Sequence, residues 1–204
     1  MSKIVLYWHP MSSATPVACA LAELGVKHDR VKVDITQGEQ RRPEYLALNP
    51  NGKVPTMTVD GAPMFEALAI EMWLGETYGV KKGLWPAEGT PGRLQAMAWS
   101  TWSYVTYGAQ LVRLQAARDL GTPDDAHGTS AHKGLDQLLA LLDARLAGQP
   151  WMLGQAYSLV DLIVGSVIGY SAYIGAPVQK HAHVLAWLEK VQARPAMGIE
   201  NAAA

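Results

Sequence analysis

The chain is poor in cysteine, in phenylalanine and in charge of either sign. Cys19 is its only cysteine among 204 residues, which excludes an internal disulfide and a thiolate zinc site and suits a reducing compartment. Seventeen basic residues stand against 18 acidic ones, so a net charge of −1 offers no basic field for nucleic acid or an anionic membrane. No apolar run is long enough to span a membrane, and only a short one follows Lys3, so no signal peptide is expected. These absences favour a cytoplasmic protein with no nucleic-acid or membrane partner.

The first half of the chain alternates between strand and helix patterns. The apolar run 4–8 predicts a buried strand, and apolar residues at helical spacing over 17–24 predict a helix that Gly25 ends. The alternating segment 31–35 predicts a second strand. Together these segments form a βαβ unit, which implies parallel strand pairing.

A hairpin and a helix complete this half. A short helix is expected over 44–48, and strands over 56–59 and 63–65 flank the turn signal Asp60-Gly61. A further helix is expected over 66–78, so the order becomes βαβ followed by ββα.

The second half is helical throughout. Residues 81–90 are rich in glycine and proline and indicate a linker. The segment 158–170 is apolar on most faces and should lie at the centre of a helical domain. The helices expected beyond the linker, separated after the first by a polar loop over 120–129, are 91–118, 133–146, 158–170 and 184–191.

Three stretches of this chain are specific enough to carry a family resemblance. Residues 49–55 read NPNGKVP, residues 65–70 read FEALAI, and residues 158–161 read SLVD. They resemble the NPxGxVP, ESxAI and S/T-x-x-D segments of cytosolic glutathione transferases, and the likeness covers nearly the whole chain. The loop 9–15 and residues 38–40 look most like the serine-using phi class of plants and its bacterial relatives.

The resemblance implies a fold class of α+β followed by all-α. Residues 1–80 would form a thioredoxin-like domain that binds glutathione, residues 81–90 a linker, and residues 91–204 an all-helical domain for the second substrate. Glutathione would be the co-substrate, a small hydrophobic electrophile its partner in a detoxification reaction, and the protein a homodimer.

Two serines are the candidate catalytic residues. Glutathione reacts as a thiolate, and a hydroxyl that donates to sulfur beside a helix N-terminus stabilises that anion. Ser12 stands where the phi pattern has this hydroxyl. Ser13 aligns with the cysteine of some bacterial classes, although it could instead be only the helix N-cap. Tyr7 is a third candidate, with packing beneath the sheet as its alternative role.

Backbone and helix-start positions would hold the rest of glutathione. In the family the bond before the proline corresponding to Pro55 is cis, and it would turn the Val54 backbone outward to pair with the cysteinyl part. The glutamyl carboxylate would lie at the helix start formed by Glu66 and Ala67, where free N–H groups attract an anion. The family's serine at this helix start is replaced here by Ala67, which removes one hydroxyl donor.

The glycyl carboxylate needs a cation, and the second substrate needs an apolar pocket. Lys53 is the preferred cation, with Gln40 beside it, while Arg41 and Arg42 are expected on a solvated face. For the pocket, the candidates from the loop and the long helix are Met11, Tyr107, Leu111 and Arg113. No histidine pattern indicates a metal site.

Three functions remain open on these residues. The first is conjugation of glutathione to an apolar electrophile. The second is a glutathione-dependent thiol reductase or peroxidase, in which glutathione itself would close the disulfide because the loop has no cysteine. The third is a non-catalytic ligand-binding protein of the same fold.

Overall fold

The computed structural model describes residues 2–122 and 125–198, which fall into two compact units. One unit runs to Gly83 and takes in the chain again from Arg194, and the other is Leu84–Ala193. The sequence analysis instead assigned the residues beyond the linker to the helical domain. The difference has a physical reason, because the guanidinium of Arg194 forms an ion pair with Glu23 of the first unit.

A four-stranded sheet organises the first unit. The strands β1 (Ile4–Trp8), β2 (Asp29–Lys32), β3 (Thr56–Val59) and β4 (Ala62–Phe65) lie in the order β2-β1-β3-β4. The pairing of β1 with β2 is parallel, and the other two pairings are antiparallel. This is the thioredoxin-like arrangement that the βαβ-ββα order predicted.

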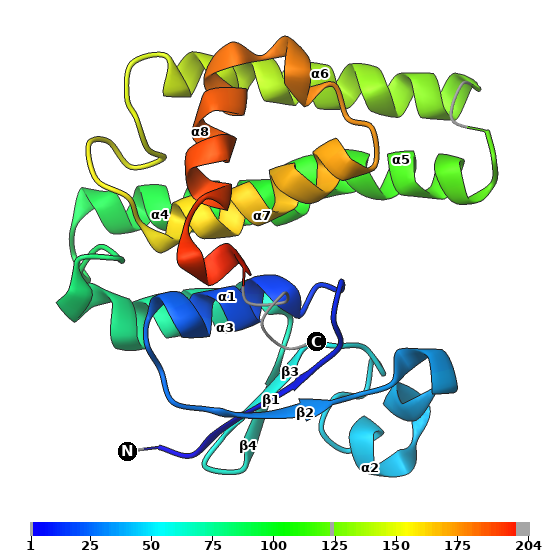
Figure 1. The fold of residues 1–204 in the computed structure, drawn as a ribbon, viewed down its shortest axis with the longest axis vertical. Helices are drawn as coiled ribbons and strands as arrows, with labels where there is room; N and C mark the ends of the chain where they lie inside the picture. The colour runs from blue at the N-terminus through cyan, green and yellow to red at the C-terminus, as the bar shows by residue number, and fades with distance from the viewer. Residues whose placement is uncertain (1, 123–124, 199–204) are drawn as a thin grey trace. The chain divides into compact units, whose positions relative to one another are not determined.

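Helices cover the sheet unevenly. Helices α1 (Thr15–Glu23) and α3 (Ala67–Leu74) pack against each other on one side of the sheet, and α2 (Pro43–Leu46) lies apart from them (Figure 1). Ile4, Leu6 and Trp8 of β1 are buried, while the residues between them are half-buried. A short 3₁₀ helix, η7 (Pro195–Gly198), packs on α1.

Short helical turns connect these elements, and one of them shortens the second strand. The structure ends β2 at Lys32, whereas alternation predicted a strand over 31–35. The carboxylate of Asp34 accepts hydrogen bonds from the N–H groups of Thr36 and Gln37, which turns the chain into a helix instead of extending the strand. The turns that follow β2 and α3 are η1 (Ile35–Gln37), η2 (Glu39–Arg41), the π-helical segment η3 (Gly75–Gly79) and η4 (Val80–Lys82).

The second unit is entirely helical. The expected long helix is interrupted, because α4 (Pro91–Trp102) and α5 (Gly108–Asp119) are joined by the π-helical segment η5 (Ser103–Tyr107). Helix α6 begins earlier than the amphipathic pattern indicated, because Asp125 caps its N-terminus inside the expected polar loop. The remaining elements are α6 (Ala126–Leu146), α7 (Leu159–Tyr173), η6 (Val178–Lys180) and α8 (Ala182–Gln192).

Helix α7 forms the core of this unit, as its apolar faces predicted. All residues from Leu159 to Gly165 are buried. Asp161 accepts hydrogen bonds from the N–H groups of Ser158 and Met152 and from the indole of Trp187. Burial raises the pKa of the Asp161 carboxyl, and these donors oppose that rise. Within the part of the chain that the structure describes, no helix is both long and apolar enough to cross a membrane.

Candidate functional site

The register of the sheet brings three functional segments to one end of it. Tyr7 of β1 lies opposite Thr56 of β3, and Thr56 lies opposite Phe65 of β4. Because both pairings are antiparallel, the residues after β1, before β3 and after β4 all leave the sheet at the same end. The loop 9–14, the turn 49–55 and the start of α3 therefore meet there.

The two serines of the loop make different contacts. The Ser12 hydroxyl donates to the carbonyl oxygen of His9 at 2.6 Å and accepts a hydrogen bond from the Ala14 N–H at 3.1 Å. The Ser13 hydroxyl donates to the carbonyl oxygen of Val54 at 2.9 Å. The alternative role of Ser13 as helix N-cap is therefore wrong, since Ala14 holds the N-cap position without a side-chain cap.

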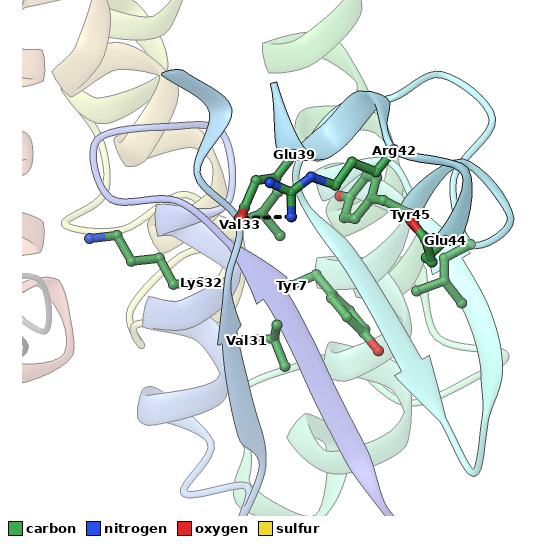
Figure 2. Close-up of a pocket in the computed structure, with 9 residues that line it drawn as sticks. Tyr7, Val31, Lys32, Val33, Glu39, Arg42, Glu44 and Tyr45 are labelled. Atoms are coloured by element: carbon green, nitrogen blue, oxygen red, sulfur yellow. Dashed lines mark ion pairs between the residues drawn. The ribbon is translucent and has the colours of Figure 1, made fainter. Parts of the chain in front are cut away.

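The third candidate, Tyr7, belongs to a different face. Its ring packs edge-on against Tyr45 of α2 with centroids 6.1 Å apart. Both rings line a pocket of about 420 Å³ between α2, η2 and the sheet (Figure 2). An ion pair of 3.0 Å joins Glu39 and Arg42 at this pocket. None of the residues proposed to contact glutathione lines this pocket, and the contact with Tyr45 favours the packing role for Tyr7.

Val54 presents backbone groups at the convergent end. The predicted cis bond between Val54 and Pro55 is confirmed. The Val54 carbonyl oxygen accepts from Ser13, whereas its N–H has no hydrogen-bond partner within residues 2–122 and 125–198. An amide donor without a protein partner is satisfied by water or by a ligand.

The start of α3 offers further donors. Glu66 occupies the N-cap position with a φ of +73°, a backbone conformation that is uncommon for a residue with a side chain. Its side chain is exposed, and Ala67 behind it is buried. Because the first N–H groups of a helix lack intrahelical partners, this position attracts an anion even though Ala67 has no hydroxyl.

The turn 49–53 ends at Lys53, the residue predicted to bind the glycyl carboxylate. Lys53 is exposed at its end. The Arg41 guanidinium donates to the Asn51 carbonyl oxygen at 3.4 Å, and both Arg41 and Arg42 are exposed, as the sequence analysis expected. A Cβ on Gly52 would stand 2.9 Å from both an Arg41 nitrogen and the Gln40 carbonyl oxygen, which is why this position requires glycine. Sequence reasoning named Arg41 among the residues near this turn, but its place two residues before Pro43 gave no signal of the contact with Asn51.

The amide of Gln40 is turned into the fold. Its Nε2 donates to the carbonyl oxygen of Ile35 at 3.2 Å. Among the described residues its buried Oε1 has no hydrogen-bond partner. One of its two N–H donors is thus engaged inside the unit, and its role towards a carboxylate stays a prediction.

The residues predicted for the second-substrate pocket are divided between the two units, and their role stays a prediction. Met11 is 79% exposed, with a φ of +53°. Tyr107 and Leu111 are buried in the helical unit, and the Tyr107 hydroxyl is hydrogen-bonded to Ser171 at 2.7 Å. Arg113 lines a separate pocket of about 250 Å³ between α5 and the start of α6. Within the described residues, no cluster of three or more His, Cys, Asp or Glu side chains could hold a metal ion.

Comparison with known protein families finds two matches. Residues 11–77 match the glutathione S-transferase N-terminal domain, and residues 115–190 match the glutathione S-transferase C-terminal domain. The matched segments fall on the sheet unit and on the helical unit, respectively.

Individual relatives span almost the full chain. Glutathione S-transferase hmp2 of Hypomyces subiculosus is 32% identical, with 94% of each chain covered. The disulfide-bond oxidoreductase YfcG of Escherichia coli is 27% identical and covers 96% of this chain and 93% of its own. A sphingomonad glutathione S-transferase solved in complex with glutathione superposes with a TM-score of 0.84 at 28% identity, over 98% of both chains.

Proposed function

Since the chain belongs to the glutathione S-transferase family, we propose that it binds glutathione and transfers it to a small apolar electrophile. The observation that carries this proposal is the Val54 backbone. Its N–H has no partner within the described residues, and it lies beside the Ser13 hydroxyl and close to the start of α3. An extended peptide such as glutathione can pair with Val54 through its cysteinyl amide and carbonyl groups.

Each charged end of glutathione would then meet a complementary group. The glutamyl carboxylate would bind the free N–H groups at the start of α3, and Glu66 would face the ligand's ammonium. The glycyl carboxylate would bind Lys53, with Arg41 close to the same turn. The relative solved in complex with glutathione supports the binding of this ligand.

The chemical step requires the thiolate of glutathione. A free thiol has a pKa of about 8.5, so it is mostly protonated at neutral pH. A hydroxyl donor near the N-terminus of α1 lowers that value by stabilising the anion. The sulfur electron pair then forms a bond to the electrophilic carbon. In a substitution the leaving group departs with the electron pair of the bond that breaks. In an addition the electron pair of the broken π bond takes up a proton.

We assign the hydroxyl donor to Ser12. In the free protein the Ser12 hydroxyl donates its hydrogen bond to the His9 carbonyl oxygen, so on glutathione binding it must turn from that carbonyl towards the sulfur. Its bond from the Ala14 N–H can persist, because it uses the oxygen lone pair and not the proton. That bond keeps the Ser12 oxygen fixed at the helix start.

Calorimetric titration with glutathione at neutral pH tests the proposal. We expect one site per chain, with weaker binding in Lys53→Ala and unchanged binding in the control Lys27→Ala, whose exposed lysine lies beyond α1. An absence of binding heat with wild-type protein would contradict the proposal. It would favour the third function, a non-catalytic ligand-binding protein of the same fold.

Disulfide reduction is the second candidate, and the relationship to YfcG favours it. Cys19 is 1% exposed in α1, so a mixed disulfide on the protein is not available and two glutathione molecules would have to supply both electrons. Parallel assays with a model apolar electrophile and with a small disulfide plus glutathione would separate the two reactions.

A further inference from the structure

A buried tyrosine forms a hydrogen bond with the peptide group that precedes Val54. The Tyr45 hydroxyl donates to the carbonyl oxygen of Lys53 at 2.7 Å, and the Asn49 side-chain amide donates to the same oxygen at 2.8 Å. The Thr56 hydroxyl lies 2.8 Å from the Tyr45 oxygen. Because the single hydroxyl proton of Tyr45 is donated to the Lys53 carbonyl oxygen, Thr56 is the donor of this third hydrogen bond.

These bonds hold the Lys53 carbonyl towards the protein interior. Tyr45 is 6% exposed and Asn49 is 2% exposed. The ring of Tyr45 packs edge-to-face with the ring of Tyr7, and both side chains are labelled in Figure 2. Burial raises the pKa of the Tyr45 hydroxyl, which keeps it a donor across the neutral range.

The geometry of a trans peptide carries this effect to Val54. Within the described residues the only cis bond is Val54–Pro55, so the bond between Lys53 and Val54 is trans. In a planar trans peptide the C=O and N–H groups point in opposite directions. A Lys53 carbonyl directed at Tyr45 therefore directs the Val54 N–H away from α2.

The next peptide group is fixed from the other side. Ser13 donates to the Val54 carbonyl oxygen, so the peptide groups on both sides of the Val54 Cα are held by side chains. Both of the Val54 groups that would pair with glutathione are thereby oriented before any ligand arrives, which lowers the entropic cost of binding.

We infer that Tyr45 is a positioning residue for glutathione, acting through the Lys53 carbonyl to orient the Val54 N–H. The inference rests on the proposed function. Tyr45 lies in α2 and faces away from the ligand, so its effect is on the affinity for glutathione and not on the chemistry of the sulfur.

The test compares three variants of the full chain. Tyr45→Phe keeps the ring and removes the bonds to Lys53 and Thr56. Thr56→Val removes only the bond between Thr56 and Tyr45. Tyr78→Phe, whose ring packs on Trp73, removes a tyrosine hydroxyl elsewhere in the same unit and serves as the control.

We expect Tyr45→Phe to raise both the Kd and the KM for glutathione roughly five- to tenfold, with kcat at saturating glutathione unchanged. Thr56→Val and Tyr78→Phe should keep the wild-type Kd. Equal affinity of Tyr45→Phe and wild type would overturn the inference, and so would an equal loss in Thr56→Val, which would indicate general loosening of β3.

A second readout needs no glutathione. The NMR resonance of the Val54 amide should be sharp in wild type and in Thr56→Val, and broadened in Tyr45→Phe because the peptide group can then reorient. An unchanged Val54 resonance in Tyr45→Phe would refute the positioning role. Wild type that shows the sharp resonance but binds no glutathione would instead contradict only the proposed function.

Discussion

The hydroxyl of Ser13 donates a 2.9 Å hydrogen bond to the carbonyl oxygen of Val54, 41 residues further along the chain. This bond ties the loop after β1 to the turn before β3. It also gives Ser13 a role that the sequence did not indicate, because sequence reasoning could only weigh a thiol contact against a helix cap.

Ser13→Ala should therefore act on stability and on the Val54 backbone. We expect a loss of about 1 kcal/mol in the free energy of unfolding, the usual value of one hydrogen bond. The inflection of the pH–rate profile with a model electrophile should stay where it is in wild type. Denaturant unfolding and the pH–rate profile check the two parts, and an upward shift of the inflection would mean that Ser13, and not Ser12, contacts the thiol.

Ala67→Ser should tighten glutathione binding. A serine at this helix start adds a hydroxyl donor to the glutamyl carboxylate, worth roughly 1.5–3 kcal/mol for a charged acceptor. This corresponds to a tenfold to hundredfold lower Kd by calorimetry. Ala22→Ser, in the last turn of α1, is the control and should leave the Kd unchanged. If Ala67→Ser also leaves it unchanged, the carboxylate does not bind at the start of α3.

The protein is expected to be a twofold dimer, and the helical unit indicates which surface is covered. Leu94, Val105 and Val112, from α4, η5 and α5, are each more than 60% exposed. Trp99 in α4 is partly covered within the chain, since the Arg145 guanidinium stacks 4.6 Å from its ring centroid. An apolar surface of this kind is favourable to bury against a second copy.

The change Val105→Glu should dissociate that dimer. Wild type should sediment at twice the chain mass of 22.1 kDa, and Val105→Glu should sediment at the chain mass at micromolar concentration. Leu120→Glu, at an exposed leucine beyond α5, is the matched control and should stay dimeric. Wild type that sediments only as a single chain would refute the dimer.

Tyr107 should make the helical unit sensitive to alkali. Burial raises the pKa of its hydroxyl from the usual 10.0 to about 12, because ionisation is costly in the core. Since the folded-state pKa is the higher one, the stabilisation is complete below pH 10 and is lost as the pH rises through 12. The loss is at most about 3 kcal/mol. The free energy of unfolding should be measured for wild type and Tyr107→Phe across this pH range. The variant should lack the part of the decline that comes from the Tyr107 hydroxyl. An equal decline in both proteins would contradict a role for Tyr107.

Much of the fold could be predicted from local patterns. The strands 4–8 and 56–59 have the predicted bounds, because an apolar run and an alternating run each end at a polar residue or turn. The second strand and the start of α6 were misplaced for one shared reason. Asp34 and Asp125 cap helical turns through side-chain hydrogen bonds, and this local chemistry outweighs the periodicity around it.

The site was less predictable, because its contacts join residues far apart in the chain. The motif at 49–55 indicated the cis bond before Pro55. Nothing in the sequence indicated that Tyr45 would hold the Lys53 carbonyl, or that Arg41 would lie against the Asn51 carbonyl. Such contacts depend on how α2 and η2 pack on the turn, and hydrophobic periodicity carries no information on that.

The ionisation of bound glutathione tests the central claim most directly. The ultraviolet absorbance of the thiolate should be followed against pH for glutathione bound to wild type and to Ser12→Ala. The account predicts an inflection well below the free-thiol value of about 8.5 in wild type, and a return towards that value in Ser12→Ala. An inflection at the free-thiol value in wild type, with glutathione demonstrably bound, would contradict the account and leave this chain a binding protein with a transferase fold.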